Sequence, residues 1–63
     1  MSAAQDFIGM SKKSAQDKAE KRNLIFRLIR FDQEMYFSYP EDVRDDRVCV
    51  ELDNGVITKA IIC

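Results

Sequence analysis

The residue types best suited to chemistry in this 63-residue sequence form one short cluster of opposite charges. Its members are Glu41, Asp42, Arg44, Asp45, Asp46 and Arg47. A planar guanidinium forms charge-assisted hydrogen bonds with carboxylates and main-chain oxygens, so two arginines can fix an extended loop without a disulfide. The carboxylates lack the spacing and the loop glycine of an EF-hand, so we expect no metal ion here. The cluster therefore predicts a solvated loop that is braced by its own counter-charges.

Enzymatic chemistry is disfavoured by the residue types that the sequence lacks. It contains no histidine, which is the commonest general base and the commonest metal ligand. Two cysteines, Cys49 and Cys63, are too few for a structural zinc site, and no nucleophile–base pair can be assembled from them. The alternative of one disulfide is disfavoured because Cys63 is the last residue, where fraying would fix a bridge poorly. We expect two free thiols in a reducing cytoplasm, and neither an enzyme nor a cofactor.

A second cluster is apolar and aromatic. It consists of Met35, Tyr36, Phe37 and Tyr39, and it ends at Pro40. These residues either belong to a strand and the core, or Met35, Tyr36 and Phe37 form an exposed contact surface for a protein partner.

Basic residues gather in the first half of the sequence. They are Lys12, Lys13, Lys18, Lys21, Arg22, Arg27 and Arg30. Such a set is compatible with a nucleic-acid-binding face, but Asp17 and Glu20 interrupt it and the net charge of the chain is −1. We therefore expect a solvated helix face and no nucleic acid.

The elements that position these clusters begin with a helix. Ser11 is a good N-cap because its hydroxyl can accept a main-chain N–H, and residues 12–22 contain no Gly, Pro or β-branched residue. Ala15 and Ala19 share one face of this helix and form a thin apolar stripe that can lie closely on a sheet. Residues 24–31 are apolar on both alternating faces apart from two arginines, which is typical of a central strand covered on both sides.

A hairpin is expected at the C-terminal end. Residues 47–53 alternate cleanly, Asn54-Gly55 predicts a tight turn, and residues 56–63 form the returning strand. Residues 34–39 either add a strand paired with the first one or belong to an extended loop before the hairpin. The predicted fold class is α+β, a single domain over residues 1–63. One N-terminal helix packs on a small mixed β-sheet, with a long loop between the first strand and the C-terminal hairpin.

Three motifs resemble those of known protease inhibitors. They are Gly9-x-Ser11-x-x-x-Ala15, Arg44-x-x-Arg47-Val48 and Asp46-Arg47-Val48-x-Val50-Glu51-Leu52-Asp53-x-Gly55-x-Ile57-Thr58. The first two look like the potato type I inhibitors of subtilisin and chymotrypsin. The third is similar to a related group of small bacterial and fungal protease inhibitors. The resemblance covers nearly the whole chain, from Phe7 to Cys63.

This resemblance implies a reactive loop with its supports. The loop residues would be Tyr39, Pro40, Glu41, Asp42 and Val43, braced by Arg44 and Arg47. The scissile bond would lie between Glu41 and Asp42. A loop already held in a substrate-like form loses little entropy on entering a protease cleft. The resemblance therefore implies competitive inhibition of a serine protease of the subtilisin or chymotrypsin type.

The alternative function is that of a small cytoplasmic interaction module. Such a module would use the same scaffold to bind and modulate a non-protease partner, with Met35, Tyr36 and Phe37 as its contact surface. The sequence shows neither a secretory signal nor an apolar run long enough to span a membrane. We therefore expect a cytoplasmic protein with no membrane contact, a monomer or homodimer that binds a protein partner.

Overall fold

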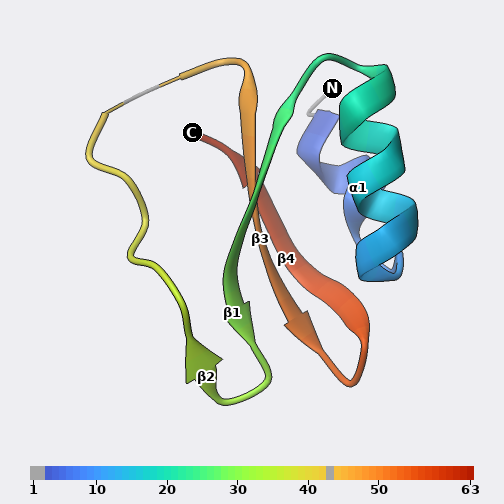
Figure 1. Cartoon of the computed structure of the whole chain (residues 1–63), viewed down its shortest axis with the longest axis vertical. Helices are drawn as coiled ribbons and strands as arrows, with labels where there is room; N and C mark the ends of the chain where they lie inside the picture. The colour runs from blue at the N-terminus through green and yellow to red at the C-terminus, as the bar shows by residue number, and fades with distance from the viewer. Residues whose placement is uncertain (1–2, 43) are drawn as a thin grey trace.

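The computed structural model describes residues 3–42 and 44–63, in which a helical region is followed by a sheet (Figure 1). The helical elements are the 3-10 helix η1 (Ala3–Phe7) and the α-helix α1 (Lys12–Lys21). The strands are β1 (Ile25–Phe31), β2 (Glu34–Met35), β3 (Arg47–Asp53) and β4 (Val56–Ile62). The helix packs on a four-stranded mixed sheet, which confirms the predicted α+β class.

The sheet has the strand order β2-β1-β3-β4. β1 runs parallel to β3, whereas β2 pairs with β1, and β4 with β3, in antiparallel fashion. Because parallel neighbours point the same way, the chain that leaves β1 must return along the sheet before β3 begins. β2, residues 36–42 and residues 44–46 belong to this return, and Figure 1 shows them on the side of the sheet away from α1.

α1 begins and ends for local reasons that the sequence already shows. The Ser11 hydroxyl accepts a hydrogen bond from the main-chain N–H of Ser14 at 3.3 Å, which confirms Ser11 as the N-cap. The chain then turns at Asn23, whose φ of 59° is a left-handed conformation common after helices. The helix ends at Lys21, one residue earlier than predicted. In the described part of the chain, no helix is both long and apolar enough to cross a membrane.

The main hydrophobic core lies between the helical region and the sheet. Its buried members are Phe7, Ala15, Ala19, Val48, Val50, Leu52 and Ile57. Ala15 and Ala19 are the predicted apolar stripe, and their small side chains allow α1 to approach the strands closely. Phe7 is fully buried and carries η1 into the same core.

The C-terminal hairpin follows the prediction from its turn residues. Asn54 and Gly55 have φ angles of 54° and 81°, as a tight turn with two left-handed residues requires. β3 covers the predicted range, and β4 ends one residue before Cys63.

β1 contains a bulge that the hydrophobic pattern does not predict. Leu28 aligns with Val50 and the next aligned pair is Arg30 with Glu51, so Ile29 is an extra residue in β1. A bulge changes the face to which the following side chains point, compared with a regular strand. The regular alternation expected over residues 24–31 therefore holds only as far as Leu28.

The bulge brings two arginines to the same face of the sheet. Arg27 aligns with Cys49 and Arg30 with Glu51, and these two β3 residues point away from the core. In a regular strand, two residues three positions apart would point to opposite faces. We call the face that carries these four side chains the open face of the sheet.

Residues 34–39 are part strand and part loop. Only the first two pair with β1, as β2, and the chain leaves the sheet from Tyr36 onward. The N–H groups of Tyr36 and Phe37 both donate to the carbonyl oxygen of Ile29, at 2.8 and 3.3 Å. The carbonyl oxygen of the bulge residue Ile29 thus binds the chain where it leaves the sheet. Each of the two alternatives predicted for residues 34–39 therefore holds for part of this range.

Candidate functional site

Arg47, the first residue of β3, supports the loop at Asp42. Only 9% of its side chain is exposed. Nε donates to the main-chain oxygen of Cys63 at 2.8 Å. Nη2 donates to the main-chain oxygen of Asp42 at 3.3 Å and to its Oδ1 at 3.2 Å. The hydrogen bond from Arg47 lowers the pKa of the Asp42 carboxyl, and the one guanidinium links the loop to the sheet.

Arg44 binds a different carboxylate of the acidic cluster from the one that Arg47 binds. Its Nε and Nη2 donate to the two carboxylate oxygens of Asp46, both at 2.8 Å, and both side chains are 45% exposed. This hydrogen bond also lowers the pKa of Asp46. Arg44 therefore stiffens the approach to β3, whereas Arg47 holds the loop residue Asp42.

Tyr39 ties the earlier part of the segment to the open face. Its hydroxyl donates to Oε2 of Glu51, and its ring lies 5.2 Å from the Lys59 ammonium. Burial and, second, the bond to Glu51 raise the pKa of Tyr39, so this phenol is a neutral donor. The pKa of Glu51 is lowered by the hydrogen bonds from Tyr39 and then Arg30.

Arg30 fixes the carboxylate that receives Tyr39. Its Nε donates to Glu51 Oε1 at 2.7 Å, and its Nη1 and Nη2 donate to the two oxygens of Asp53, both at 2.8 Å. The Thr58 hydroxyl also donates to Asp53 at 2.7 Å. Arg30 first and Thr58 second lower the pKa of Asp53 to about 2. The acceptor of Tyr39 thus belongs to a hydrogen-bonded network across β1, β3 and β4.

The hydrogen bond of Tyr39 to Glu51 and the contact of Arg47 with Asp42 hold the chain on either side of Glu41. Tyr39 is bound to Glu51, and Pro40 behind it is partly buried. Glu41 is exposed, and 65% of the Asp42 side chain is exposed although Arg47 holds it. The peptide bond between Glu41 and Asp42 therefore joins two exposed residues, and the anchored residues Tyr39 and Asp42 lie on either side of Glu41. Val43, the last residue of the predicted reactive loop, lies outside the described residues.

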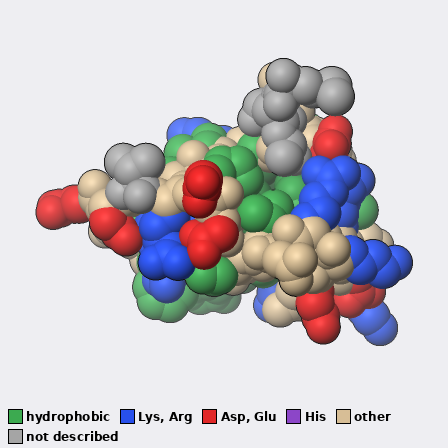
Figure 2. Space-filling model, turned by 90° about the horizontal axis from the view of Figure 1, so that it is seen from above, with side chains coloured by type: hydrophobic (Ala, Val, Ile, Leu, Met, Phe, Trp, Pro, Cys, Tyr) green, Lys and Arg blue, Asp and Glu red, His purple; other side chains and the backbone are tan. Residues whose placement is uncertain are grey.

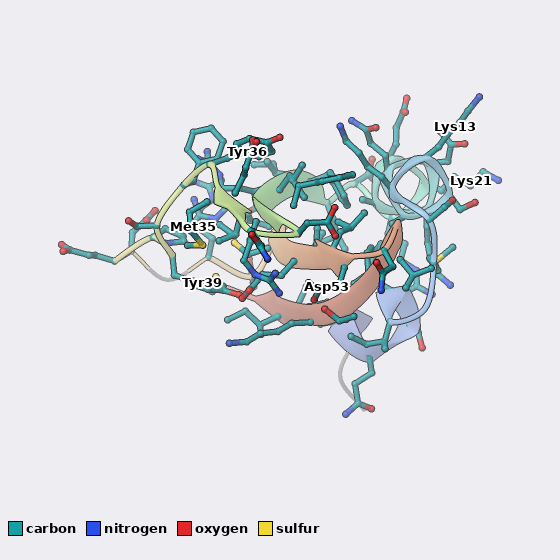
Figure 3. All side chains as sticks on the ribbon, turned by 90° about the horizontal axis from the view of Figure 1, so that it is seen from below. Lys13, Lys21, Met35, Tyr36, Tyr39 and Asp53 are labelled. Carbon is teal, nitrogen blue, oxygen red and sulfur yellow. The ribbon has the colours of Figure 1, made fainter. Side chains whose placement is uncertain are left out.

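The loop and the basic face of α1 lie at opposite ends of the molecule (Figure 3). Figure 2 shows acidic side chains gathered around basic ones at the end of the molecule that carries the loop. Figure 3 places Met35, Tyr36 and Tyr39 at that same end, and Lys13 and Lys21 of α1 at the other. The basic helix and the braced loop are thus different surfaces.

The aromatic cluster is divided between the exposed surface beside the loop and the open face of the sheet. Met35, Tyr36 and Phe37 are 60%, 49% and 52% exposed, so they lie on the surface beside the loop and outside the core. The guanidinium of Arg27 lies 5.0 Å from the centre of the Phe37 ring. Tyr39 is partly buried on the open face instead.

The network of Arg30, Glu51, Asp53 and Thr58 is the part of the site that sequence analysis missed. Glu51 and Asp53 share the non-core face of the alternating third strand, and this pattern is visible in the sequence. The arginine opposite them is recognisable only once the parallel pairing of β1 with β3 and the bulge at Ile29 are known. Complementary charge on two predicted strand faces is the signal that could have suggested the pairing.

The two thiols also meet on the open face. Cys49 and Cys63 are free, and their Sγ atoms are 3.2 Å apart. Burial, and then the hydrogen bond with Cys63, raise the pKa of Cys49 to about 11. Among residues 3–42 and 44–63, no three His, Cys, Asp or Glu side chains are arranged to hold a metal ion.

Compared with protein-family models, with curated proteins and with solved structures, the chain gives no match. The functional argument therefore depends on the geometry described above, together with the motifs of the sequence.

Proposed function

We propose that the protein is an inhibitor of a serine protease of the subtilisin or chymotrypsin type, acting through its loop around Glu41 and Asp42. The observation that supports this proposal is the exposed Glu41–Asp42 bond between two anchored residues. A protease binds its substrate as an extended segment, and a segment already held in place loses little further entropy on binding.

The two anchors also suit the way in which such an inhibitor resists cleavage. If a protease attacks the carbonyl of Glu41, the acyl side remains attached to the sheet through Tyr39, two residues earlier. The new amino group belongs to Asp42, which Arg47 holds by its main-chain oxygen and its carboxylate. The amine therefore stays beside the acyl-enzyme and can re-form the peptide bond.

Glu41 would occupy the primary specificity pocket of the protease. Its carboxylate favours an enzyme whose pocket carries a positive charge or strong hydrogen-bond donors, as in glutamate-specific serine proteases. The total contact would bury about 1,600 Å², or about 800 Å² on each partner. The exposed side chains of Tyr36 and Phe37, which precede the loop, would supply part of that area.

A panel of proteases with exchanged specificity residues tests this proposal. We expect the wild-type chain to inhibit a glutamate-specific serine protease at micromolar concentration or below. Glu41→Lys should weaken that inhibition at least about 100-fold and create inhibition of trypsin, and Glu41→Phe should do the same for chymotrypsin.

The matched control is Glu34→Lys, which makes the same charge change at an exposed residue of β2 outside the loop. It should leave the choice of protease unchanged. The proposal fails if the wild-type chain and both Glu41 variants leave subtilisin, chymotrypsin, trypsin and the glutamate-specific enzyme fully active.

One observation favours the second candidate function, an interaction module for a non-protease partner. Met35, Tyr36 and Phe37 are consecutive large apolar residues, and each is about half exposed or more. This function predicts a partner, recovered by affinity capture, whose binding is lost in Tyr36→Ala or Phe37→Ala and unaffected by Glu41→Lys. The inhibitor proposal predicts that Glu41→Lys has the larger effect.

A further inference from the structure

Cys49 of β3 and Cys63, just beyond the end of β4, face each other on the open face of the sheet. Cys49 lies in β3 and aligns with Ile61 of β4. Cys63 is two residues beyond Ile61, so its side chain points to the same face of the sheet. The Sγ atoms of the two cysteines are 3.2 Å apart, and both thiols are free.

This arrangement needs only a small movement to become a disulfide. The sulfur atoms of a disulfide are about 2.05 Å apart, so the two Sγ atoms must approach by roughly a further 1.2 Å. Cys63 lies just after the end of β4, where the chain can adjust more easily than inside the strand. Cys49 is fully buried and Cys63 is partly exposed, so an oxidant in solution reaches Cys63 first.

We propose that Cys49 and Cys63 are a redox modification site, which forms an internal disulfide with a small-molecule disulfide such as oxidised glutathione. The Cys63 thiolate attacks one sulfur of the oxidant, forms a mixed disulfide and releases one glutathione thiolate. Cys49 then attacks the Cys63 sulfur, its proton passes to the departing glutathione thiolate, and the second glutathione leaves as a thiol. The protein loses two electrons and two protons, and the oxidised glutathione becomes two thiols.

The disulfide would affect Arg47, the residue that holds the loop at Asp42. The main-chain oxygen of Cys63 accepts the bond from Arg47 Nε at 2.8 Å, and the Cys63 N–H donates to the Arg47 carbonyl at 3.2 Å. Nη2 of the same guanidinium holds Asp42. A covalent bond between Cys63 and β3 keeps the acceptor of Arg47 in place, so the loop opens less often.

Formation of the disulfide does not depend on protease inhibition, whereas its effect on an inhibitory loop rests on the proposed function. The test therefore measures the bond and the opening of the loop separately from inhibition. The full-length protein is incubated either with oxidised glutathione or with a phosphine reductant. Intact mass, free thiols, Tm and the rate at which a glutamate-specific protease cuts the loop are then compared.

We expect the oxidised wild-type chain to lose about 2 Da and both free thiols without forming a dimer. Its Tm should rise by about 10 °C, because the bond constrains the unfolded chain. Cleavage after Glu41 should slow at least about fivefold, since the cut becomes permanent only when the loop opens and the Asp42 amine leaves the acyl-enzyme. Cys63→Ser and Cys49→Ala should show none of these three changes. The Arg47→Ala variant should form the disulfide, but its cleavage should be equally fast in the oxidised and the reduced protein.

Three results would overturn the inference. One is a glutathione adduct at Cys63 that never resolves to an internal disulfide, and another is a disulfide that joins two chains. The third is an internal disulfide that leaves the cleavage rate of the wild-type loop unchanged. If the disulfide forms and cleavage slows but no protease is inhibited, the proposed function fails and this inference stands.

Discussion

The two faces of the sheet are held by different kinds of interaction. On the α1 side, the core consists of buried apolar side chains such as Phe7, Val50 and Leu52. On the open face, the contacts include directional hydrogen bonds and ion pairs that involve Arg30, Arg47 and their carboxylates. The first face provides most of the stability, because apolar burial is the dominant favourable contribution to folding. The second face determines where the loop lies.

This difference suits the proposed function. Apolar packing does not specify the conformation of a segment that must remain exposed to a protease. Charge-assisted hydrogen bonds do so, because their directions are defined and they can hold the backbone while leaving neighbouring side chains free. Asp42 shows both properties: Arg47 binds it and 65% of its side chain is exposed.

The largest expected effect is the loss of stability when a buried aromatic ring is removed from the α1 side of the sheet. Phe7→Ala removes a fully buried ring and should lower the free energy of unfolding by about 3–5 kcal/mol. A domain of this length is stable by only about 3–9 kcal/mol, so the variant should be close to unfolded. Phe37→Ala removes the same ring where it is 52% exposed and should cost less than about 1 kcal/mol. Urea unfolding followed by circular dichroism measures both, and equal losses would contradict the comparison.

The next effect distinguishes the two arginines of the Arg44-x-x-Arg47 motif. Arg47→Ala leaves the Asp42 carboxylate and the main-chain oxygen of Cys63 without their buried donor. We expect cleavage after Glu41 to accelerate at least about tenfold and the free energy of unfolding to fall by about 2 kcal/mol. Arg44→Ala breaks only an exposed pair with Asp46 and should change both quantities little. If Arg44→Ala accelerates cleavage as much as Arg47→Ala, the role given to Arg47 is wrong.

A smaller effect is expected at the second anchor. Glu51→Gln weakens the acceptor shared by Tyr39 and Arg30, and Tyr39→Phe removes only the hydroxyl that donates to it. Each change should accelerate loop cleavage severalfold and cost about 1 kcal/mol of stability. A double-mutant cycle that combines Tyr39→Phe with Glu51→Gln, measured by loop cleavage, should show coupling of about 1 kcal/mol. In the control cycle, Glu34→Gln replaces Glu51→Gln. Purely additive effects would show that the hydrogen bond does not hold the loop.

The smallest effect is the acid sensitivity of the open face. The pKa of Asp53 lies near 2 in the folded chain, below its ordinary value of 3.8, and the pKa values of Asp42 and Glu51 are also lowered. A carboxyl whose pKa is lowered by folding contributes stability above its unfolded value, and this is lost as pH falls through the folded value. Stability should therefore decline from about pH 4.5 toward about pH 2. Asp53→Asn should make this decline shallower, and an unchanged pH profile would contradict the assigned cause.

The parts of the fold that sequence analysis predicted are those with local causes. Ser11 caps α1 by bonding a residue three positions on, and Asn54-Gly55 turns by its own backbone preference. The apolar stripe of Ala15 and Ala19 likewise follows from spacing along a single helix. In each case the interaction lies within a few residues, so the pattern alone is sufficient.

The parts that could not be predicted depend on pairing between distant segments. The bulge at Ile29 exists because β1 aligns with β3 in a particular register, and it alone places Arg30 opposite Glu51. Arg44 and Arg47 are alike in type, yet only Arg47 falls at the buried start of β3, beside Cys63. The sequence motif therefore predicted which residues gather at the loop, and the strand register decided which of them hold it.

The most direct test of the account mixes the chain with an equimolar amount of a glutamate-specific serine protease and follows both partners over time. Protease activity and the intact mass of the chain are measured in the same samples. The account predicts that most of the protease activity is lost while most of the chain remains uncut between Glu41 and Asp42. Complete cleavage at that bond with no loss of protease activity would show that the loop is a substrate, and would contradict the central claim.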